Sequence, residues 1–461
     1  KNYGDILVVS VTSDQHVNKG PNRPAFGEEN RLKALAALNA IDYVVLSKDP
    51  TSISIINELK PSIYCKGPDY RINQNDISGE IKNEINAVKK NGGKIIYTKG
   101  ITFSSSNLIN KFSQTYSNEQ KTLIGKIKKK YSFIEIRRLI ENFKKLKVLV
   151  IGETIIDQYV FCDALGKSGK ESMLVLRELN TEQYLGGAAA ISRHLSQFCS
   201  KITLLSMLGG KSEFLREIKK NLPKNIKFNY IKKKNSPTIV KKRFLDYVNK
   251  NKVLGVYKID DDALTNVEEK LFIFKLKKLL SSHDLVIVSD YGHGLISKKS
   301  SKIICKNSKY LALNAQINAA NVGYHSMRNY ENVNCVIINE RELRHELRDK
   351  NGNLEILMKR LTKEQNIKNL VVTRGDQGSV FYNEKKNKFN LCEAYAKTAT
   401  DKIGSGDAML AVIALCLKSG INRELASLIA SLAAAQSVAT IGNKESINKT
   451  QILKSLDSIL K

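Results

Sequence analysis

The sequence TDKIGSGDAMLAVIALCLKSG, residues 400–420, joins a run of small residues to a long apolar segment. Gly404, Ser405 and Gly406 leave the first N–H groups of the following helix unobstructed, and such free amides bind anions. Asp407 begins that helix, where a carboxylate can accept the proton of a substrate hydroxyl during phosphoryl transfer. A tight turn with an N-cap aspartate explains the same residues equally well. Other motifs must therefore decide between a phosphate site and a simple cap.

Apolar strands alternate with helical segments on the N-terminal side of this stretch. Expected strands lie at 147–153, 202–208, 284–290, 335–339 and 369–375. Buried strands that alternate with helices predict a parallel sheet covered on both faces. Residues 237–260 instead alternate β-branched and charged residues, which predicts a two-stranded flap with one wet face.

The N-terminal part repeats the α/β alternation on a smaller scale. A strand is expected at Asp5–Val11, followed by a helix, a second strand and a helix that ends near Lys60. A Lys-rich stretch of helical spacing follows. We therefore expect three parts: an α/β domain at 1–113, a helical linker at 114–145 and a second α/β domain at 146–461.

Composition limits the classes of function. A chain of 461 residues exceeds one ordinary hydrophobic core. Its net charge of +30 comes mostly from scattered lysines, with no zinc-finger or helix-turn-helix spacing, so nucleic acid is not an expected partner. The seven cysteines include no Cys-x-x-Cys pair, and no apolar run reaches 18 residues. We expect a cytoplasmic protein with no membrane partner.

Several motifs upstream of Asp407 carry groups suited to a nucleotide and a polyol. A strand end rich in glycine suits nucleotide phosphates, an amide beside a carboxylate suits Mg²⁺ held through water, and a carboxylate near paired glycines suits sugar hydroxyls. These residues are, in the same order, Thr373, Arg374, Gly375 and Gly378; Asn339 and Glu342; and Asp157, Gly186 and Gly187.

In this order the motifs resemble the ribokinase (PfkB) family of sugar kinases over residues 145–461. The resemblance implies a ribokinase-like doubly wound α/β sheet with a β flap, and ATP and Mg²⁺ as cofactors. It makes Asp407 the base, residues 404–406 the anion hole, Asn339 and Glu342 the Mg²⁺ and phosphate pair, and residues 373–378 part of the ATP site. Asp290 matches a stretch that lines the cleft in the heptose-phosphate kinase branch. Relatives also suggest a homodimer through the flap.

Two flap cations bear on the substrate. Lys241 and Arg243 would suit a phosphate already carried by the acceptor, which favours a sugar phosphate over a free sugar. Ordinary charge on a strand edge explains them equally well. The identity of the sugar and its anomer are not determined by these residues.

Residues 1–113 resemble the nucleotidyltransferase half of bifunctional heptose-phosphate kinase/nucleotidyltransferases, with a partial Rossmann-like fold. The resemblance assigns phosphate contacts to the basic residues and the triphosphate to a serine run; the residues are Lys19, Arg23, Arg31, Lys66, Ser104, Ser105 and Ser106. The family's paired-histidine motif is absent before the first strand, and His16 is a single histidine in the following loop. We therefore expect this domain, as given, to bind without catalysing, and an upstream extension to restore the motif.

Three functions remain open. The first is phosphorylation of heptose 7-phosphate at C1, coupled to nucleotidyl transfer for nucleotide-sugar synthesis. The second is a PfkB kinase of another sugar or nucleoside with an inactive N-terminal domain. The third is a non-catalytic nucleotide- or RNA-binding protein.

Overall fold

The computed structural model describes residues 3–21, 23–71, 76–77, 79–98, 106, 109–110, 115–396 and 398–461. The chain divides into two compact units, Lys1–Phe133 with Lys449–Lys461, and Ile134–Asn448. The last helix thus groups with the first unit, whereas the sequence analysis placed it in the second domain. The expected helical linker is divided between the units.

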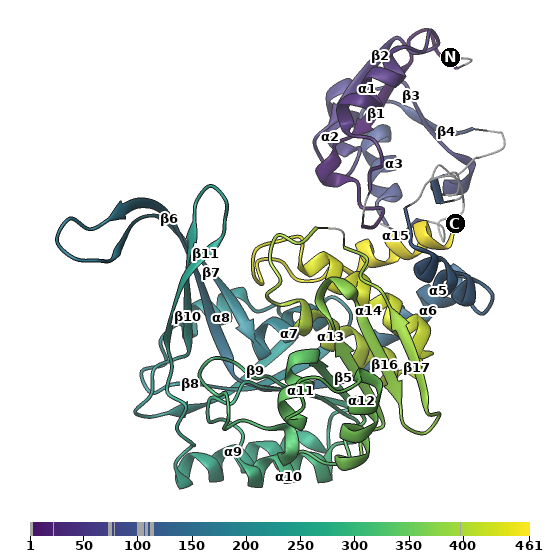
Figure 1. The fold of residues 1–461 in the computed structure, drawn as a ribbon. Coiled ribbons are helices and arrows are strands. Elements are labelled where there is room, and N and C mark those ends of the chain that lie inside the picture. The colour runs from purple at the N-terminus through teal and green to yellow at the C-terminus, as the bar shows by residue number, and fades with distance from the viewer. Residues whose placement is uncertain are drawn as a thin grey trace. The chain divides into compact units, whose positions relative to one another are not determined.

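In the first unit, two parallel strand pairs alternate with helices (Figure 1). The strands are β1 (Val8–Thr12) with β2 (Tyr43–Ser47), and β3 (Ile63–Lys66) with β4 (Lys94–Tyr97). The helices are α1 (Glu28–Ala36), α2 (Ile53–Leu59), α3 (Ile81–Lys90), α5 (Asn118–Lys128) and α15 (Lys449–Leu460). Ile56 of α2 and Val88 of α3 are buried in one small cluster. The alternation is the predicted Rossmann-like pattern.

The second unit is built on a nine-stranded sheet in the order β17-β16-β15-β14-β13-β12-β5-β8-β9. In chain order its strands are β5 (Lys147–Gly152), β8 (Lys201–Gly209), β9 (Ile226–Lys233), β12 (Leu285–Asp290), β13 (Leu311–Ala315), β14 (Cys335–Asn339), β15 (Asn369–Thr373), β16 (Ser379–Asn383) and β17 (Lys388–Cys392). Seven neighbouring strands, from β9 to β15, run parallel, and β16 and β17 are antiparallel. The five expected strands are all present.

Helices cover both faces of this sheet (Figure 1). The helices of the unit are α6 (Phe133–Glu141), α7 (Ala188–Ser196), α8 (Leu215–Asn221), α9 (Asn266–Leu280), α10 (Lys298–Asn307), α11 (Glu340–Leu347), α12 (Leu354–Glu364), α13 (Ser405–Lys418) and α14 (Arg423–Ser437). Leu149 and Ile151 of β5 share one core cluster with residues of α9 to α12. Val148 and Val150, equally buried, point to the opposite face, against which α7 and α13 pack. The sheet is doubly wound, as predicted.

The flap is larger than the sequence indicated. The expected pair exists as β10 (Val240–Asp246) and β11 (Lys252–Lys258), but β10 also pairs with β6 (Thr154–Lys167), which pairs with β7 (Leu174–Gly187). Figure 1 shows this four-stranded sheet extending away from the helices of the unit. The sequence analysis missed β6 and β7 because each is buried at one end and exposed at the other, so neither shows a single burial pattern.

The topology gathers several predicted residues at one edge. Asp290, Asn339 and Thr373 end the parallel strands β12, β14 and β15, and Glu153 follows β5 directly. Carboxyl ends of parallel strands lie at the same sheet edge, which is where ligands bind in open α/β folds. Within the described part of the chain, no helix is long and apolar enough to cross a membrane.

Candidate active site

The start of α13 has the free amides that the sequence predicted. Gly404 precedes the helix with φ +88°, and a Cβ there would lie 2.2 Å from Asn443 Oδ1, so glycine is required. The first helical bond runs from the Ala408 amide to the Gly404 carbonyl at 2.9 Å. The amides of residues 405–407 therefore have no partner within the helix, and a Cβ at Gly406 would meet no atom within 4 Å. This turn can accept an anion without moving side chains.

Asp407 is a partly buried carboxylate in the first turn of α13. Tyr291 donates its hydroxyl to Asp407 Oδ1 at 3.0 Å. Burial raises the pKa of Asp407 to about 7; the Tyr291 hydrogen bond and Lys241 oppose that rise, and the charge of Asp157 adds to it. A carboxylate with a pKa near neutral is well matched to accept and return a proton at physiological pH.

Three neighbouring strands bring the predicted substrate groups together. Asp157 on β6 lies opposite Lys241 on β10, and Arg243 donates to Asp157 Oδ1. A Cβ at Gly186 would lie 2.1 Å from Asp157 Oδ2, so the glycine makes room for the carboxylate. Gly187, with φ +60°, begins α7. The sequence analysis gave Asp157 to the sugar and Arg243 to a phosphate, but the structure joins them in one buried ion pair.

Lys241 differs from Arg243 because its neighbours are aromatic rings, whereas Arg243 bonds a carboxylate. Its ammonium lies 5.6 Å from the ring centre of Tyr257 and 5.5 Å from that of Tyr291. Among the described residues no ion pair to Lys241 is found, and its side chain is 6% exposed. Burial lowers the pKa of Lys241, although the nearby Asp157 acts in the opposite direction. It is the buried cation of this cluster that remains available to an anion.

Asp290 is more enclosed than the sequence analysis expected. Its Oδ2 accepts the Tyr330 hydroxyl at 2.6 Å, and its Oδ1 accepts the Gly292 amide at 3.0 Å. Asp290 is 3% exposed. These contacts hold the loop after β12.

Asn339 and Glu342 cap α11 reciprocally. The Glu342 amide donates to Asn339 Oδ1, and the Asn339 amide donates to Glu342 Oε2, each at 2.8 Å. Burial raises the pKa of Glu342 to about 7, and the charge of Asp407 adds to this. Glu342 is therefore close enough to Asp407 for the two carboxylates to repel each other. The Ile317 amide donates to Glu342 Oε1 at 3.3 Å, so both Glu342 oxygens and the Asn339 oxygen already accept hydrogen bonds. A Mg²⁺ held here would need water and phosphate oxygens as further ligands.

Of the two glycines that follow β15, one leaves open space for a ligand and the other is required by the packing of the fold. Gly375, with φ +62°, has open space where a Cβ would be, which suits a close ligand approach. Gly378 is required by the fold, since its Cβ would lie 2.1 Å from the Cys392 carbonyl. Arg374 donates its Nε to Glu340 Oε2 at 3.0 Å, and Thr373 ends the strand. The backbone rather than Arg374 offers the open surface.

Sequence reasoning overlooked an aromatic and acidic network beside these groups. Tyr159 donates to Asp401 Oδ2 at 3.1 Å, and Lys252 of β11 bonds Asp401 Oδ1. The Gly442 amide donates to the same carboxylate at 3.0 Å. Asp401 precedes the glycine-rich turn by three residues. Its closeness to Asp407 in the sequence was the one feature that could have indicated a role in the site. Tyr291 lies in the same stretch as Asp290, which matches the heptose-phosphate kinase branch, but the sequence analysis gave it no role of its own.

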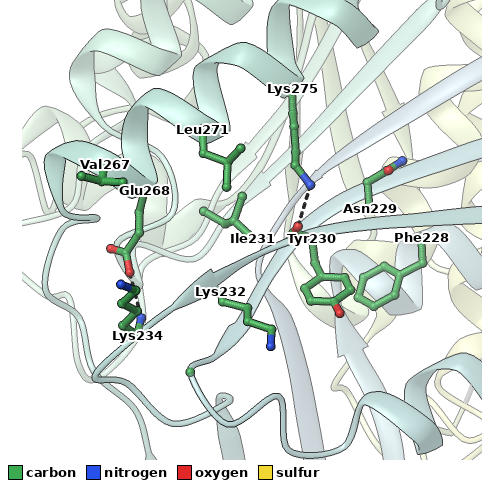
Figure 2. Close-up of a pocket in the computed structure, with 11 residues that line it drawn as sticks. Phe228, Asn229, Tyr230, Ile231, Lys232, Lys234, Val267, Glu268, Leu271 and Lys275 are labelled. Atoms are coloured by element: carbon green, nitrogen blue, oxygen red, sulfur yellow. Dashed lines mark hydrogen bonds between the residues drawn. The ribbon is translucent and has the colours of Figure 1, made fainter.

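A cavity of about 650 Å³ lies elsewhere in this unit, along β9 and α9 (Figure 2). Figure 2 shows Phe228 and Tyr230 side by side and Lys275 donating to the Tyr230 carbonyl, at 2.9 Å. No residue predicted from the sequence lines it. This cavity is therefore distinct from the surroundings of Asp407.

In the first unit, most of the predicted phosphate contacts already have protein partners. Arg31 bonds Asp14, Lys66 bonds Glu84 at 2.9 Å, and Arg23 donates to Asn110 Oδ1 at 2.9 Å. Lys19 is exposed. The buried Ser106 hydroxyl lies 3.2 Å from that of Ser458. Ser104 and Ser105 lie outside the described residues.

Comparison with known proteins finds a different family for each part of the chain. Residues 145–450 match the pfkB family of carbohydrate kinases, and residues 1–112 match the cytidylyltransferase-like family. The bifunctional protein HldE of Campylobacter jejuni is 27% identical over 305 residues, and that of Campylobacter concisus 29% over 309. Each match covers 65% of this chain and 62% of the relative, so the chain spans less than two thirds of the length of these proteins.

Solved structures resemble the fold at low sequence identity. Phosphofructokinase-2 from Escherichia coli has a TM-score of 0.55 and 13% identity, and covers 68% of this chain and 99% of its own. Ribokinase from Thermotoga maritima has a TM-score of 0.50 and 19% identity, with the same coverage. These structures support the ribokinase-like fold expected from the sequence.

Proposed function

The chain belongs to the pfkB family of carbohydrate kinases through residues 145–450, and we propose that it transfers the γ-phosphoryl group of ATP to the C1 hydroxyl of heptose 7-phosphate or a close analogue. The observation that carries this proposal is Asp407, a carboxylate of raised pKa in the first turn of α13, next to amides with no helical partner.

Asp407 serves as the general base. Asp407 Oδ2 accepts the proton of the acceptor hydroxyl while the hydroxyl oxygen bonds to the γ-phosphorus. At the same time the bond from the γ-phosphorus to the bridging oxygen of ADP breaks. The free amides of residues 405–407 stabilise the negative charge that develops on the transferred phosphoryl oxygens. ATP binds along Gly375 and the strand ends of β14 and β15. Asn339 and Glu342 would hold Mg²⁺ through water, and the ion would supply positive charge to the phosphates.

Lys241 contacts the phosphate that the acceptor already carries. It is buried and has no carboxylate partner among the described residues, and two aromatic rings hold its ammonium. Arg243 assists while remaining bonded to Asp157, since a guanidinium has five donors. Asp157, with Gly186 and Gly187 beside it, contacts sugar hydroxyls, and Asp290 shapes the adjoining loop.

The N-terminal unit, when completed by the paired-histidine motif, transfers a nucleotidyl group to the resulting sugar 1-phosphate, yielding a nucleotide sugar. The match of residues 1–112 to the cytidylyltransferase-like family supports this assignment. Lys19, Arg23, Arg31 and Ser104–Ser106 are the proposed nucleotide contacts. Lys66, which the sequence analysis also assigned to the nucleotide, is paired with Glu84 instead. The protein works in the cytoplasm on small molecules.

The flap joins two copies of the chain. Strand β11 lies at the edge of its sheet and is exposed throughout, and it carries Val253, Leu254 and Val256. An exposed apolar edge strand favours pairing with another chain. Sedimentation of wild type and Leu254→Asp tests this, because the variant should be monomeric if the flap is the interface.

The proposed reaction is tested by ³¹P NMR of the purified chain with ATP, Mg²⁺ and a panel of heptose, hexose and pentose phosphates. We expect ADP and a new sugar phosphate ester. Asp407→Asn should lower kcat by about 10²–10⁴-fold with little change in KM. The control is Asp262→Asn, an exposed aspartate outside the site. Absence of ADP with every acceptor, or full activity of Asp407→Asn, rejects the kinase mechanism.

A second candidate is a kinase of a free sugar or nucleoside. The ion pair between Arg243 and Asp157 favours it, because Arg243 is then already occupied. Arg243→Ala separates the two functions. A selective rise in KM for the phosphorylated acceptor supports the first, and an unchanged KM supports the second.

A further inference from the structure

The side chain of Tyr291 bridges the two chemical halves of the candidate site. Its hydroxyl donates to Asp407 Oδ1 at 3.0 Å, and its ring centre lies 5.5 Å from the Lys241 ammonium. Tyr291 is 5% exposed. One side chain therefore contacts both the proposed base and the proposed phosphate-binding cation.

The backbone around Tyr291 is fixed by Glu153. The Tyr291 amide donates to Glu153 Oε2 at 3.0 Å, and the His293 amide donates to Glu153 Oε1 at 3.2 Å. Glu153 is completely buried and directly follows β5. Both oxygens of a carboxylate at the end of a central strand thus hold the loop that carries Tyr291.

The carbonyl of Tyr291 is fixed as well. It accepts the Asn318 side-chain amide at 2.9 Å and the Asn321 side-chain amide at 2.8 Å. With the amide and the carbonyl both bonded, the loop cannot rotate the phenol away from Asp407 without losing buried hydrogen bonds, which is costly. The phenol is therefore preorganised.

We infer that Tyr291 is a positioning residue that orients Asp407 for proton acceptance, and that Glu153 in turn orients Tyr291. The inference rests on the proposed role of Asp407 as base. Because the hydroxyl occupies Oδ1, Oδ2 is the oxygen left to accept the proton. The hydrogen bond also favours the charged carboxylate, which a base must be before it reacts.

The other groups that act on Asp407 set the background for this effect. They are Asp157 of β6, Lys241 of β10 and Glu342 of α11. Asp157 and Glu342 disfavour a charged Asp407, and Lys241 favours it. The Tyr291 hydroxyl thus acts in the same direction as Lys241 and against two acidic neighbours.

The test compares Tyr291→Phe with wild type, using the full chain, ATP, Mg²⁺ and the sugar phosphate that is turned over fastest in the NMR panel. Phenylalanine keeps the ring beside Lys241 and removes only the hydroxyl. We expect kcat to fall about tenfold at pH 7, KM for the acceptor to change less than twofold, and the acidic limb of the kcat profile to move up by about one to two pH units. Glu153→Gln should lower kcat in the same direction.

Two controls separate positioning from stability. Tyr382 lies in β16, outside the site, and its hydroxyl donates to Asn387 Oδ1 at 3.2 Å. Tyr382→Phe removes that hydroxyl and should leave kcat and its pH profile unchanged. Tyr291→Leu removes the ring as well and should also raise KM for the phosphorylated acceptor. A wild-type profile for Tyr291→Phe, or an equal loss of kcat at every pH together with a lower Tm, overturns the inference.

The same experiment separates failure of the inference from failure of the proposed function. If Asp407→Asn is inactive while Tyr291→Phe behaves as wild type, Asp407 remains the base and only the positioning role is rejected. If Asp407→Asn is fully active, the proposed mechanism itself is rejected.

Discussion

Each unit of this protein holds a lysine between two tyrosine rings, and the two lysines differ in one partner. Lys66 lies 5.3 Å from the ring centre of Tyr64 and 5.0 Å from that of Tyr70. Lys241 lies at similar distances from Tyr257 and Tyr291. Lys66 also bonds Glu84 at 2.9 Å, whereas no carboxylate pairs with Lys241 among the described residues.

The Glu84 carboxylate helps to reverse the effect of burial on the lysine pKa. Burial acts to lower the pKa of both lysines. For Lys66, Tyr64 and Glu84 overcome that effect and raise the pKa, whereas for Lys241 the pKa stays lowered. Lys66 is therefore satisfied by the fold, and Lys241 is a cation held ready for an anion. Similar aromatic surroundings can thus serve structure in one unit and recognition in another.

Lys241→Met should give the largest effect. We expect KM for the phosphorylated acceptor to rise about 10- to 100-fold, because a charge-assisted contact to phosphate is lost. KM for ATP should stay near wild type. Steady-state kinetics of Lys241→Met and Lys66→Met measure the contrast, and equal effects of the two variants on acceptor KM would remove the distinction drawn here.

Lys66→Met should give the next largest effect, on stability. Its loss leaves the buried Glu84 carboxylate without its cation, which should lower the free energy of unfolding of the first unit by about 1–3 kcal/mol. The matched control is Lys33→Met, whose pair with Glu29 is exposed and should contribute nothing measurable. Amide hydrogen exchange of α3 reports the change. An unchanged exchange rate in Lys66→Met contradicts the structural role.

The pH dependence of the Lys66 effect has a defined sign. Its folded-state pKa is raised, so its stabilisation is fully present below the unfolded pKa of about 10.4 and is lost as pH rises through the higher folded value. The difference between Lys66→Met and wild type should therefore be constant from pH 7 to 9. A difference that disappears within this range argues against the pair.

Lys241→Met should give the smallest effect on stability, and with the opposite sign. Its folded-state pKa is lowered, so the charged form destabilises the ligand-free fold until pH rises through that value. We expect the variant to unfold at a free energy about 1 kcal/mol higher than wild type at pH 7, with the gain shrinking toward pH 10. Calorimetry without ligands measures this. Destabilisation at pH 7 would show that Lys241 is held by the fold as Lys66 is.

The central strands and the start of α13 were predictable because their signals are local. Five apolar runs became β5, β8, β12, β14 and β15, and the glycine-rich run became a helix start with an open first turn. The strands β6 and β7 escaped prediction because burial changes along each of them. Those strands supply Asp157, Gly186 and Gly187, so the sequence named these site residues without indicating the sheet that carries them.

By itself, the sequence determined the doubly wound fold, the family resemblance and the identity of Asp407 as the candidate base, since alternation, glycine spacing and residue type are properties of the chain. Only the tertiary structure decided which charged groups neutralise one another. Arg243 is joined to Asp157 and Lys66 to Glu84, whereas Lys241 remains unpaired among the described residues. Pairing depends on distances between groups far apart in the sequence, and burial then sets the strength of each interaction. For the same reason, the contact between Tyr291 and Asp407, 116 residues apart, appears only in the folded protein.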